Sequence, residues 1–484
     1  MALGAFRLTE APLDPIPHLT ELLGPAHVLT GDDTRRYAHD WTGKYNSAPR
    51  AVLRPADRDQ LAAIVTFASQ HRIPVVPVAG NTGLSGGAYA EGALMVSVER
   101  LNRIREINPR ARTATVEAGV ILSQLHDAAA AQDMVFPLTF GARGSARIGG
   151  VLSTNAGGSN VLRYGTTRAL CLGLEAVLPD GRVMDVMSPL YKDNTGLDLK
   201  DLMIGAEGTL GIITAAVVRL FPRPRAYATA MAAVESLPAA LDLLNRLQET
   251  TGGAVEAFEY MPGNFMRHLF RCRPELRPPF AEPHEINIMV EIGATAPRDA
   301  TPGPDGRLPV VAILEEALAE AMERGEVLDA VVAQNEAQRA EIWQRRELSA
   351  EICFSRQPVI DNDVALPLDL VGTFLDRMEA RLQEIDPGAE TVNVGHLGDG
   401  NLHYTVWPAT DRPEMKEIIR EAVEDEVAAL RGSFSAEHGI GLSKLSTMTR
   451  RKDPVALDVM RRIKAAIDPQ NIMNPGKLIP PGQD

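Results

Sequence analysis

The stretch that most constrains the fold is a glycine-rich loop, Val76–Gly87, with the sequence VPVAGNTGLSGG. Four of the eight residues from Gly80 to Gly87 are glycine, and the apolar segments Ile73–Val78 and Ala93–Val98 predict buried strands on either side. Glycines let backbone N–H groups converge on a ligand, and a pyrophosphate suits such a cradle. The spacing differs from the Rossmann fingerprint, and no Lys-Ser/Thr pair follows as in a P-loop. Taken alone, a loop of this kind is more often a tight turn.

The composition indicates a globular chain and excludes several functions. A chain of 484 residues, 45% hydrophobic and 23% charged, is too long for one core, so two or three domains are expected. The net charge of −14 argues against nucleic acid and against an anionic membrane surface. The three cysteines are isolated, which excludes a disulfide framework and fits the cytoplasm. We expect no signal peptide in Met1–Pro15 and no transmembrane segment.

Strand and helix patterns divide the chain into three segments. The first, residues 1–223, alternates short strands and helices and includes a hairpin around Pro179–Gly181. Pro222–Pro224 stops regular structure and marks a boundary. A new series of strands and helices follows over residues 224–430, and residues 431–484 form the tail.

A second motif, Asn393–Val406, reads NVGHLGDGNLHYTV and predicts a hairpin around the turn Gly398–Asn401. If those four residues form the loop, His396 falls opposite His403 on one sheet face, with Cβ atoms roughly 5 Å apart. That distance suits two imidazoles on one metal ion. The alternative is two hydrogen-bonded histidines on a polar face.

Two further motifs carry charged side chains. The glycine-flanked stretch Phe434–Gly441 reads FSAEHGIG and contains Glu437 and His438. The stretch Trp343–Glu347 reads WQRRE and places Arg346 on a predicted helix. Each group, taken alone, is also typical of a solvated surface.

The motifs Val76–Gly87, Phe136–Gly158 and Ile204–Thr214, in this order, resemble the flavin-binding domain of the vanillyl-alcohol oxidase-like flavoproteins. The chain is most similar to their branch of FAD-linked 2-hydroxy-acid dehydrogenases, which includes D-lactate, D-2-hydroxyglutarate and glycolate enzymes. The resemblance runs from Asp40 to Gly476. It implies an α+β fold with a PCMH-type FAD-binding domain of two α+β subdomains. A cap domain would add an antiparallel sheet with helices on one face, and the tail would return to the FAD-binding domain.

The resemblance implies FAD as the cofactor and assigns contacts to it. The matching positions are Pro77, Gly80, Asn81, Thr82, Gly83, Leu84, Ser85, Gly86, Pro137, Gly141, Ser145, Gly150, Asn155, Gly158, Glu207, Ile213 and Asn474. Many of these contacts are expected to be made by the backbone.

The family also implies a divalent metal, with zinc the most common. The residues at the ligand positions are His396, His403 and Glu437, and the neighbouring His438 matches the proposed base. In that mechanism the metal binds the carboxylate and 2-hydroxyl of the substrate, the base takes the hydroxyl proton, and a hydride passes to N5 of the flavin.

The substrate positions depart from part of the family. Arg346 matches an arginine that reaches the substrate carboxylate, a contact that guanidinium favours. The D-2-hydroxyglutarate enzymes add a Thr and a Lys at the distal carboxylate, where this chain has Ala350 and Asp361, and Thr405 replaces an Asn. We therefore expect a D-2-hydroxy monocarboxylate, lactate-like or larger. The alternative is that Asp361 points to solvent and Arg346 suffices for D-2-hydroxyglutarate.

No second redox centre is visible, so we expect an external electron acceptor: a quinone, an electron-transfer flavoprotein or a partner subunit. Three other functions remain open for a chain of this kind. It could be an oxidase that reduces oxygen, an alkyl transferase like the ether-lipid synthase of the same superfamily, or a flavin subunit of a glycolate-oxidising complex. The two hairpin histidines with Glu437 and His438 favour the dehydrogenase.

Overall fold

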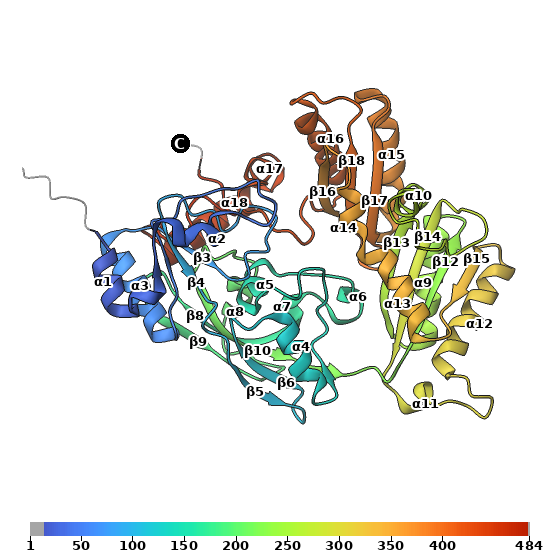
Figure 1. The fold of residues 1–484 in the computed structure, drawn as a ribbon, viewed down its shortest axis with the longest axis horizontal. Coiled ribbons are helices and arrows are strands. Elements are labelled where there is room, and N and C mark those ends of the chain that lie inside the picture. The colour runs from blue at the N-terminus through green and yellow to red at the C-terminus, as the bar shows by residue number, and fades with distance from the viewer. Residues whose placement is uncertain (1–13, 483–484) are drawn as a thin grey trace, which may run out of the picture.

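The computed structural model describes residues 14–482, so the expectation of no signal peptide falls largely on residues outside this range. An α+β half, blue to green in Figure 1, lies beside a cap, yellow-green to orange, and the C-terminal helices return to the first half. Within the described range, no helix is both long and apolar enough to cross a bilayer.

The first subdomain is a four-stranded sheet with the strand order β1-β2-β4-β3. Its elements are α1 (Ile16–Leu23), β1 (Val28–Leu29), α2 (Arg35–Ala38), β2 (Ala51–Leu53), α3 (Arg58–His71), β3 (Val75–Val78) and β4 (Leu94–Ser97). β3 and β4 run parallel, and the glycine loop joins them without a helix. The two strands predicted around the loop are therefore confirmed.

The second subdomain is a five-stranded antiparallel sheet with the order β5-β6-β10-β8-β9. Its elements are β5 (Ile104–Asn108), β6 (Thr113–Glu117), α4 (Leu122–Ala130), α5 (Ile148–Thr154), α6 (Val161–Tyr164), α7 (Thr167–Leu170), β8 (Cys171–Val177), β9 (Val183–Val186), α8 (Leu199–Met203) and β10 (Ile212–Arg219). The predicted hairpin is present, with Val177 opposite Val183. The short strands β7 (Met134–Val135) and β11 (Phe221–Pro222) pair beside it.

The cap contains a seven-stranded antiparallel sheet with the order β15-β12-β14-β13-β17-β18-β16. Its strands are β12 (Ala226–Val234), β13 (Val255–Pro262), β14 (Ile286–Ala294), β15 (Val327–Val332), β16 (Ile360–Ala365), β17 (Glu390–His396) and β18 (Asn401–Trp407). Its helices are α9 (Leu237–Thr251), α10 (Gly263–Cys272), α11 (Pro297–Ala300), α12 (Pro309–Glu323), α13 (Glu336–Glu347), α14 (Ser349–Cys353), α15 (Val371–Ile385) and α16 (Met415–Ala429).

Helices cover both faces of the cap sheet, so the prediction of helices on one face is wrong. α9, α12, α15 and α16 pack on one face, and α10, α13 and α14 pack on the other. The central strands β12, β13 and β14 are buried at almost every position. Because successive side chains point to opposite faces, such continuous burial requires cover on both sides.

The C-terminal segment contacts the first half. After α17 (Leu445–Arg451) and α18 (Pro454–Ile467), Met473 forms a parallel bridge with Val75. The N–H of Asn474 donates to the carbonyl of Val75 at 2.7 Å. The tail is thereby fixed beside β3, the strand that leads into the glycine loop. The domain limits at residues 223 and 430 stay predictions.

Candidate active site

The hairpin histidines share one face of the cap sheet, although their predicted pairing is wrong. His396 lies opposite Asn401, and His403 lies opposite Val394, a shift of two residues. Asn401 belongs to the strand because its amide donates to Asp363 on β16 at 2.9 Å. Side chains alternate with a period of two, so this shift keeps both imidazoles on the same face. Their ring centroids lie 5.7 Å apart.

Glu437 reaches the two histidines from the loop that follows the cap. One ligand atom from each of His396, His403 and Glu437 lies within 4.8 Å of the other two. Nε2 of His396 lies 3.9 Å from Oε1 of Glu437. Two imidazoles and one carboxylate suit zinc and leave a coordination position for another ligand, as in catalytic sites. The donor set therefore fits a divalent metal.

Glu259 on β13 supports this set from behind. Its Oε1 accepts a hydrogen bond from Nδ1 of His396 at 2.8 Å, and its Oε2 accepts one from Nε of Arg346 at 2.7 Å. Burial lowers the pKa of His396, but the charge of Glu259 raises it, and the net effect is a pKa of about 9. With Nδ1 occupied, Nε2 is the nitrogen left for a metal, which would displace the proton that Nε2 carries near pH 7.

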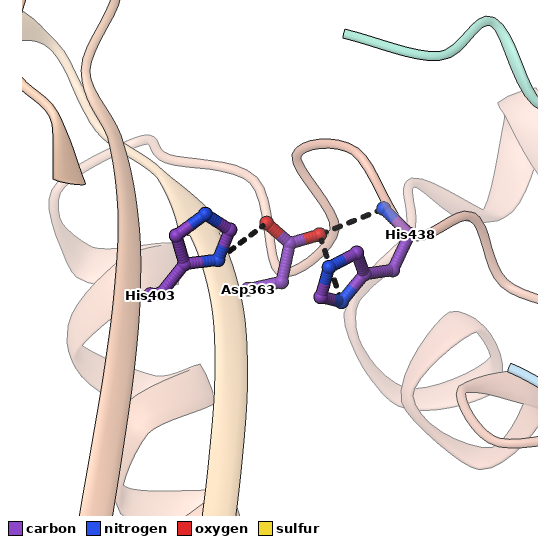
Figure 2. A group of neighbouring side chains, drawn as sticks. All are labelled: Asp363, His403 and His438. Carbon is purple, nitrogen blue, oxygen red and sulfur yellow. Dashed lines mark hydrogen bonds and ion pairs between the residues drawn. The ribbon is translucent and has the colours of Figure 1, made fainter. Parts of the chain in front are cut away.

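Asp363 connects the hairpin to the loop that carries Glu437 and His438, and Figure 2 shows it between His403 and His438. Its Oδ2 accepts the backbone N–H groups of Glu437 and His438, both at 2.9 Å. Its Oδ1 lies 3.9 Å from Nδ1 of His403, and its Oδ2 lies 3.7 Å from Nδ1 of His438. Asp363, His403 and His438 form a second set of possible metal ligands. Asp363 therefore fixes the loop and faces both imidazoles.

Electrostatics around Asp363 favour an ionised carboxylate. Its burial opposes ionisation, but the neighbouring His438 and Lys444 and the backbone N–H of His438 hold its pKa well below the usual range. Burial lowers the pKa of His403 to about 3, so this imidazole is neutral near pH 7. A neutral imidazole is the form that binds a metal.

Of the predicted substrate residues, Asp361 and Thr405 lie on the same sheet face, and Arg346 lies on α13. Asp361 on β16 lies opposite Thr405 on β18, and Oγ1 of Thr405 donates to Oδ1 of Asp361 at 3.0 Å. Nη1 of Arg346 donates to Oγ of Ser349 at 2.9 Å, whereas the neighbouring Ala350 is exposed. The strand register thus supports placing Asp361 on the sheet face that carries His403.

The glycine loop has the properties of a cradle for FAD. A Cβ on Gly83 would meet no heavy atom within 4 Å, so the backbone there faces open space. Gly80 is different, since its Cβ would lie 2.4 Å from the carbonyl oxygen of Ser145 on the second predicted stretch. Oδ1 of Asn474 is buried without a partner, while its Nδ2 bonds the carbonyls of Gly87 and Glu207 at 3.0 and 2.7 Å. An enclosed acceptor without a donor fits a bound group that carries N–H atoms.

The other predicted FAD positions lie in loops and in α5, except for Glu207 and Ile213, whose side chains contact other parts of the protein. Gly150 lies in α5, and the loops on either side of this helix carry Pro137, Gly141, Ser145, Asn155 and Gly158. The glycine loop carries Asn81, Thr82, Leu84, Ser85 and Gly86 after Pro77 on β3. Glu207 uses its carboxylate for the backbone N–H groups of Ile440 and Gly441, at 2.7 and 2.8 Å. Ile213 packs in the core of the second subdomain. These two side chains are engaged within the protein.

Sequence reasoning missed Glu259, Asp363 and Lys444. Glu259 and Asp363 are buried beside the site, and Lys444 is half-buried there, with its Nζ 3.9 Å from Oδ2 of Asp363. Glu259 stands in the apolar strand VEAFEYMP, and Asp363 stands in IDNDVA. A carboxylate inside a buried strand is the signal that could have identified both.

Comparisons with known proteins give two family matches. Residues 49–187 match the FAD binding domain family. Residues 223–478 match the family of FAD linked oxidases, C-terminal domain. The two matches together cover the glycine loop and the hairpin of His396 and His403.

Individual relatives extend over most of the chain. It is 36% identical over 452 residues to D-2-hydroxyglutarate dehydrogenase of Xanthomonas citri pv. viticola, covering 92% of each protein. It is 33% identical over 452 residues to a putative mitochondrial D-lactate dehydrogenase of Schizosaccharomyces pombe, covering 91% of this chain and 84% of that protein. Substrate-bound p-cresol methylhydroxylase has a similar structure, with a TM-score of 0.72, 16% identity and 96% of each chain covered. The predicted α+β, PCMH-type fold is confirmed.

Proposed function

This chain belongs to the family of FAD-linked oxidases, and from that premise we propose that it is a metal-assisted dehydrogenase of D-2-hydroxy acids. It would convert the substrate to the 2-oxo acid. The single observation that carries the proposal is the convergence of His396, His403 and Glu437 within 4.8 Å. His438 is the residue after Glu437, and its imidazole lies beside the carboxylate of Asp363.

The residues present divide the chemical work between them. Bound FAD would supply the hydride acceptor, and a divalent metal, with zinc preferred, would supply a Lewis acid for the substrate oxygens. His438 takes the proton of the 2-hydroxyl, a task suited to an imidazole near neutral pH. Asp363 holds the backbone of His438 in place. Glu259 fixes the orientation of His396.

The site favours a substrate with one carboxylate. Two cationic side chains lie at the site, but each already has an anionic neighbour. Arg346 is paired with Glu259, and Lys444 lies near Asp363. Asp361 adds a negative charge beside Thr405. A second substrate carboxylate close to Asp361 would be repelled by this charge. We therefore propose a D-2-hydroxy monocarboxylate, lactate-like or larger.

A second candidate is D-2-hydroxyglutarate. It is favoured by the name of the Xanthomonas relative, which covers 92% of this chain at 36% identity. On that alternative Asp361 stays hydrogen-bonded to Thr405 and away from the substrate.

Two finer points belong to the same proposal. The electrons would leave to an external quinone, an electron-transfer flavoprotein or a partner subunit, since the isolated cysteines offer no iron–sulfur ligation. The cytoplasm is the proposed compartment, because all three cysteines are free.

A screen of 2-hydroxy acids with a dye acceptor tests the proposal. Both enantiomers of lactate, longer 2-hydroxy monocarboxylates and 2-hydroxyglutarate would be compared by kcat/KM with the isolated chain. The D monocarboxylates are expected to give the highest values. A preference for L enantiomers would contradict the stereochemical assignment. Absence of turnover with every acid would favour the subunit of a larger complex.

A further inference from the structure

Lys477 lies in a C-terminal turn that is fixed against the flavin cradle. Three residues before it, Nδ2 of Asn474 donates to the carbonyl of Gly87. One residue after it, the N–H of Leu478 donates to the carbonyl of Gly441 at 3.1 Å. The backbone around Lys477 therefore has a defined place between the glycine loop and the loop that carries the site residues.

The side chain of Lys477 extends toward the end of the glycine loop. Its Nζ lies 5.9 Å from the ring centroid of Tyr89. The N–H of Tyr89 in turn donates to the carbonyl of Gly86, the last part of the cradle. The ammonium is thus next to backbone that the fold presents to FAD.

The ammonium is buried without an anionic partner. Lys477 is 6% exposed, and within residues 14–482 no carboxylate forms an ion pair with it. Burial alone lowers its pKa to about 8. The half-buried Lys464 contrasts with it, because its ammonium contacts Asp468 and the carbonyls of Thr209 and Met473.

An unpaired buried ammonium lowers the stability of the fold unless a ligand supplies the missing charge. Lys477 adjoins the cradle through its contact with the ring of Tyr89. An anionic ligand in the cradle would therefore be attracted at short range.

We propose that Lys477 is the cation that meets the negative charge of bound FAD. The inference rests on FAD binding and is independent of the substrate. FAD carries negative charge in its pyrophosphate and, after reduction, in the isoalloxazine ring. Both are parts of one ligand, and binding measurements distinguish them.

The test uses the full chain after removal and re-addition of flavin, with FAD affinity read from flavin fluorescence. Lys477→Met removes the charge and keeps the length of the side chain. We expect the Kd for FAD to rise about tenfold or more at low salt. Lys477→Arg should restore most of the affinity. Lys452→Met, at an exposed lysine, is the matched control and should match the wild type.

Two further measurements locate the charge. If Lys477 meets the pyrophosphate, Lys477→Met should weaken ADP binding together with FAD binding. If it meets the reduced ring, ADP binding stays the same and the midpoint potential of bound FAD falls, by about 30 mV for a tenfold preference. A folded Lys477→Met protein with unchanged FAD affinity, ADP affinity and potential would overturn the proposal. Lys477→Gln provides the same comparison if the Met variant does not fold.

Discussion

Oε1 of Glu259 lies 2.8 Å from Nδ1 of His396, and both side chains are buried. This carboxylate–histidine pair fixes which imidazole nitrogen faces the candidate metal site. Glu259 stays ionised there, because its burial is opposed by the charges of His396 and Arg346, which keep its pKa below the usual value. Such pairs orient metal ligands and raise their basicity.

Glu259→Gln should weaken metal binding by roughly 10–100-fold, the usual effect of losing a partner of a metal ligand. FAD binding should be unchanged, because Glu259 lies in the cap. Metal affinity would be measured by competition with a chelating dye. Glu390→Gln, at the exposed start of the same strand as His396, is the control. Equal metal affinity in both variants would remove Glu259 from the account.

The two histidines on either side of Asp363 should respond differently. His403→Ala should lose bound metal and most turnover while keeping FAD, and His396→Ala should behave in the same way. His438→Ala should keep metal and FAD but lose turnover by roughly 10²–10⁴-fold, the range for a missing general base. Metal analysis beside steady-state rates gives the answer. Near-normal turnover of His438→Ala would take the base role from His438.

Gly83→Val should abolish or strongly weaken FAD binding without loss of stability. A Cβ at Gly83 meets no heavy atom of the protein within 4 Å, so the side chain would occupy only the space expected for FAD. Gly80→Val should instead destabilise the fold, because its Cβ would lie 2.4 Å from the carbonyl of Ser145. Thermal unfolding and flavin content separate the two effects, with Gly482→Val as control. A normal flavin spectrum in Gly83→Val would contradict the role of the loop.

Asp361→Lys should narrow the gap between monocarboxylates and D-2-hydroxyglutarate. Two like charges at about 4 Å interact by roughly 4 kcal/mol near a protein surface and by roughly 1 kcal/mol in bulk water. The expected gain for D-2-hydroxyglutarate is thus between several-fold and about a thousand-fold in kcat/KM. Thr405→Val, which removes only the hydroxyl that bonds Asp361, is the companion variant. If D-2-hydroxyglutarate is the best substrate of the wild type, Asp361 does not act on the substrate.

The pH dependence of stability should reveal Lys477. Its pKa is lowered by burial from 10.5 to about 8. Between these values the unfolded chain binds more protons than the folded one, so the stability of the flavin-free protein should rise with pH. Lys477→Met should lack this rise. Bound FAD should also suppress it, because a nearby negative charge raises the pKa again. Unfolding curves across this pH window, with and without FAD, provide the measurement.

Local patterns predicted much of the fold. The strands around Val76–Gly87 and the hairpin at Pro179–Gly181 follow from short apolar runs and turn residues, and both are present. The pairing of His396 was wrong by two residues because Asn401 is also typical of a turn. Its contact with Asp363, 38 residues away in the chain, places it in the strand. That contact is invisible to local reasoning.

The candidate metal ligands were predicted from the sequence, but the carboxylates that contact them were not. His396 and His403 share a motif, whereas Glu259 is 137 residues before His396. Only the pairing of β13 with β17 brings Glu259 opposite His396. The contact of Asp363 with the loop of His438 likewise depends on how β16 joins the sheet edge. Tertiary pairing therefore decides which carboxylates support the site.

Anaerobic reduction of the bound flavin in a single turnover tests the central claim most directly. The enzyme with metal, the enzyme after metal removal and the His438→Ala variant would each be mixed with D- and L-2-hydroxy acids, and flavin absorbance would be followed. The account predicts rapid bleaching by a D acid only in the unmodified enzyme with metal bound, and neither after metal removal nor in His438→Ala. Equal bleaching after metal removal, or faster bleaching by the L acid, would contradict a metal-assisted D-2-hydroxy-acid dehydrogenase.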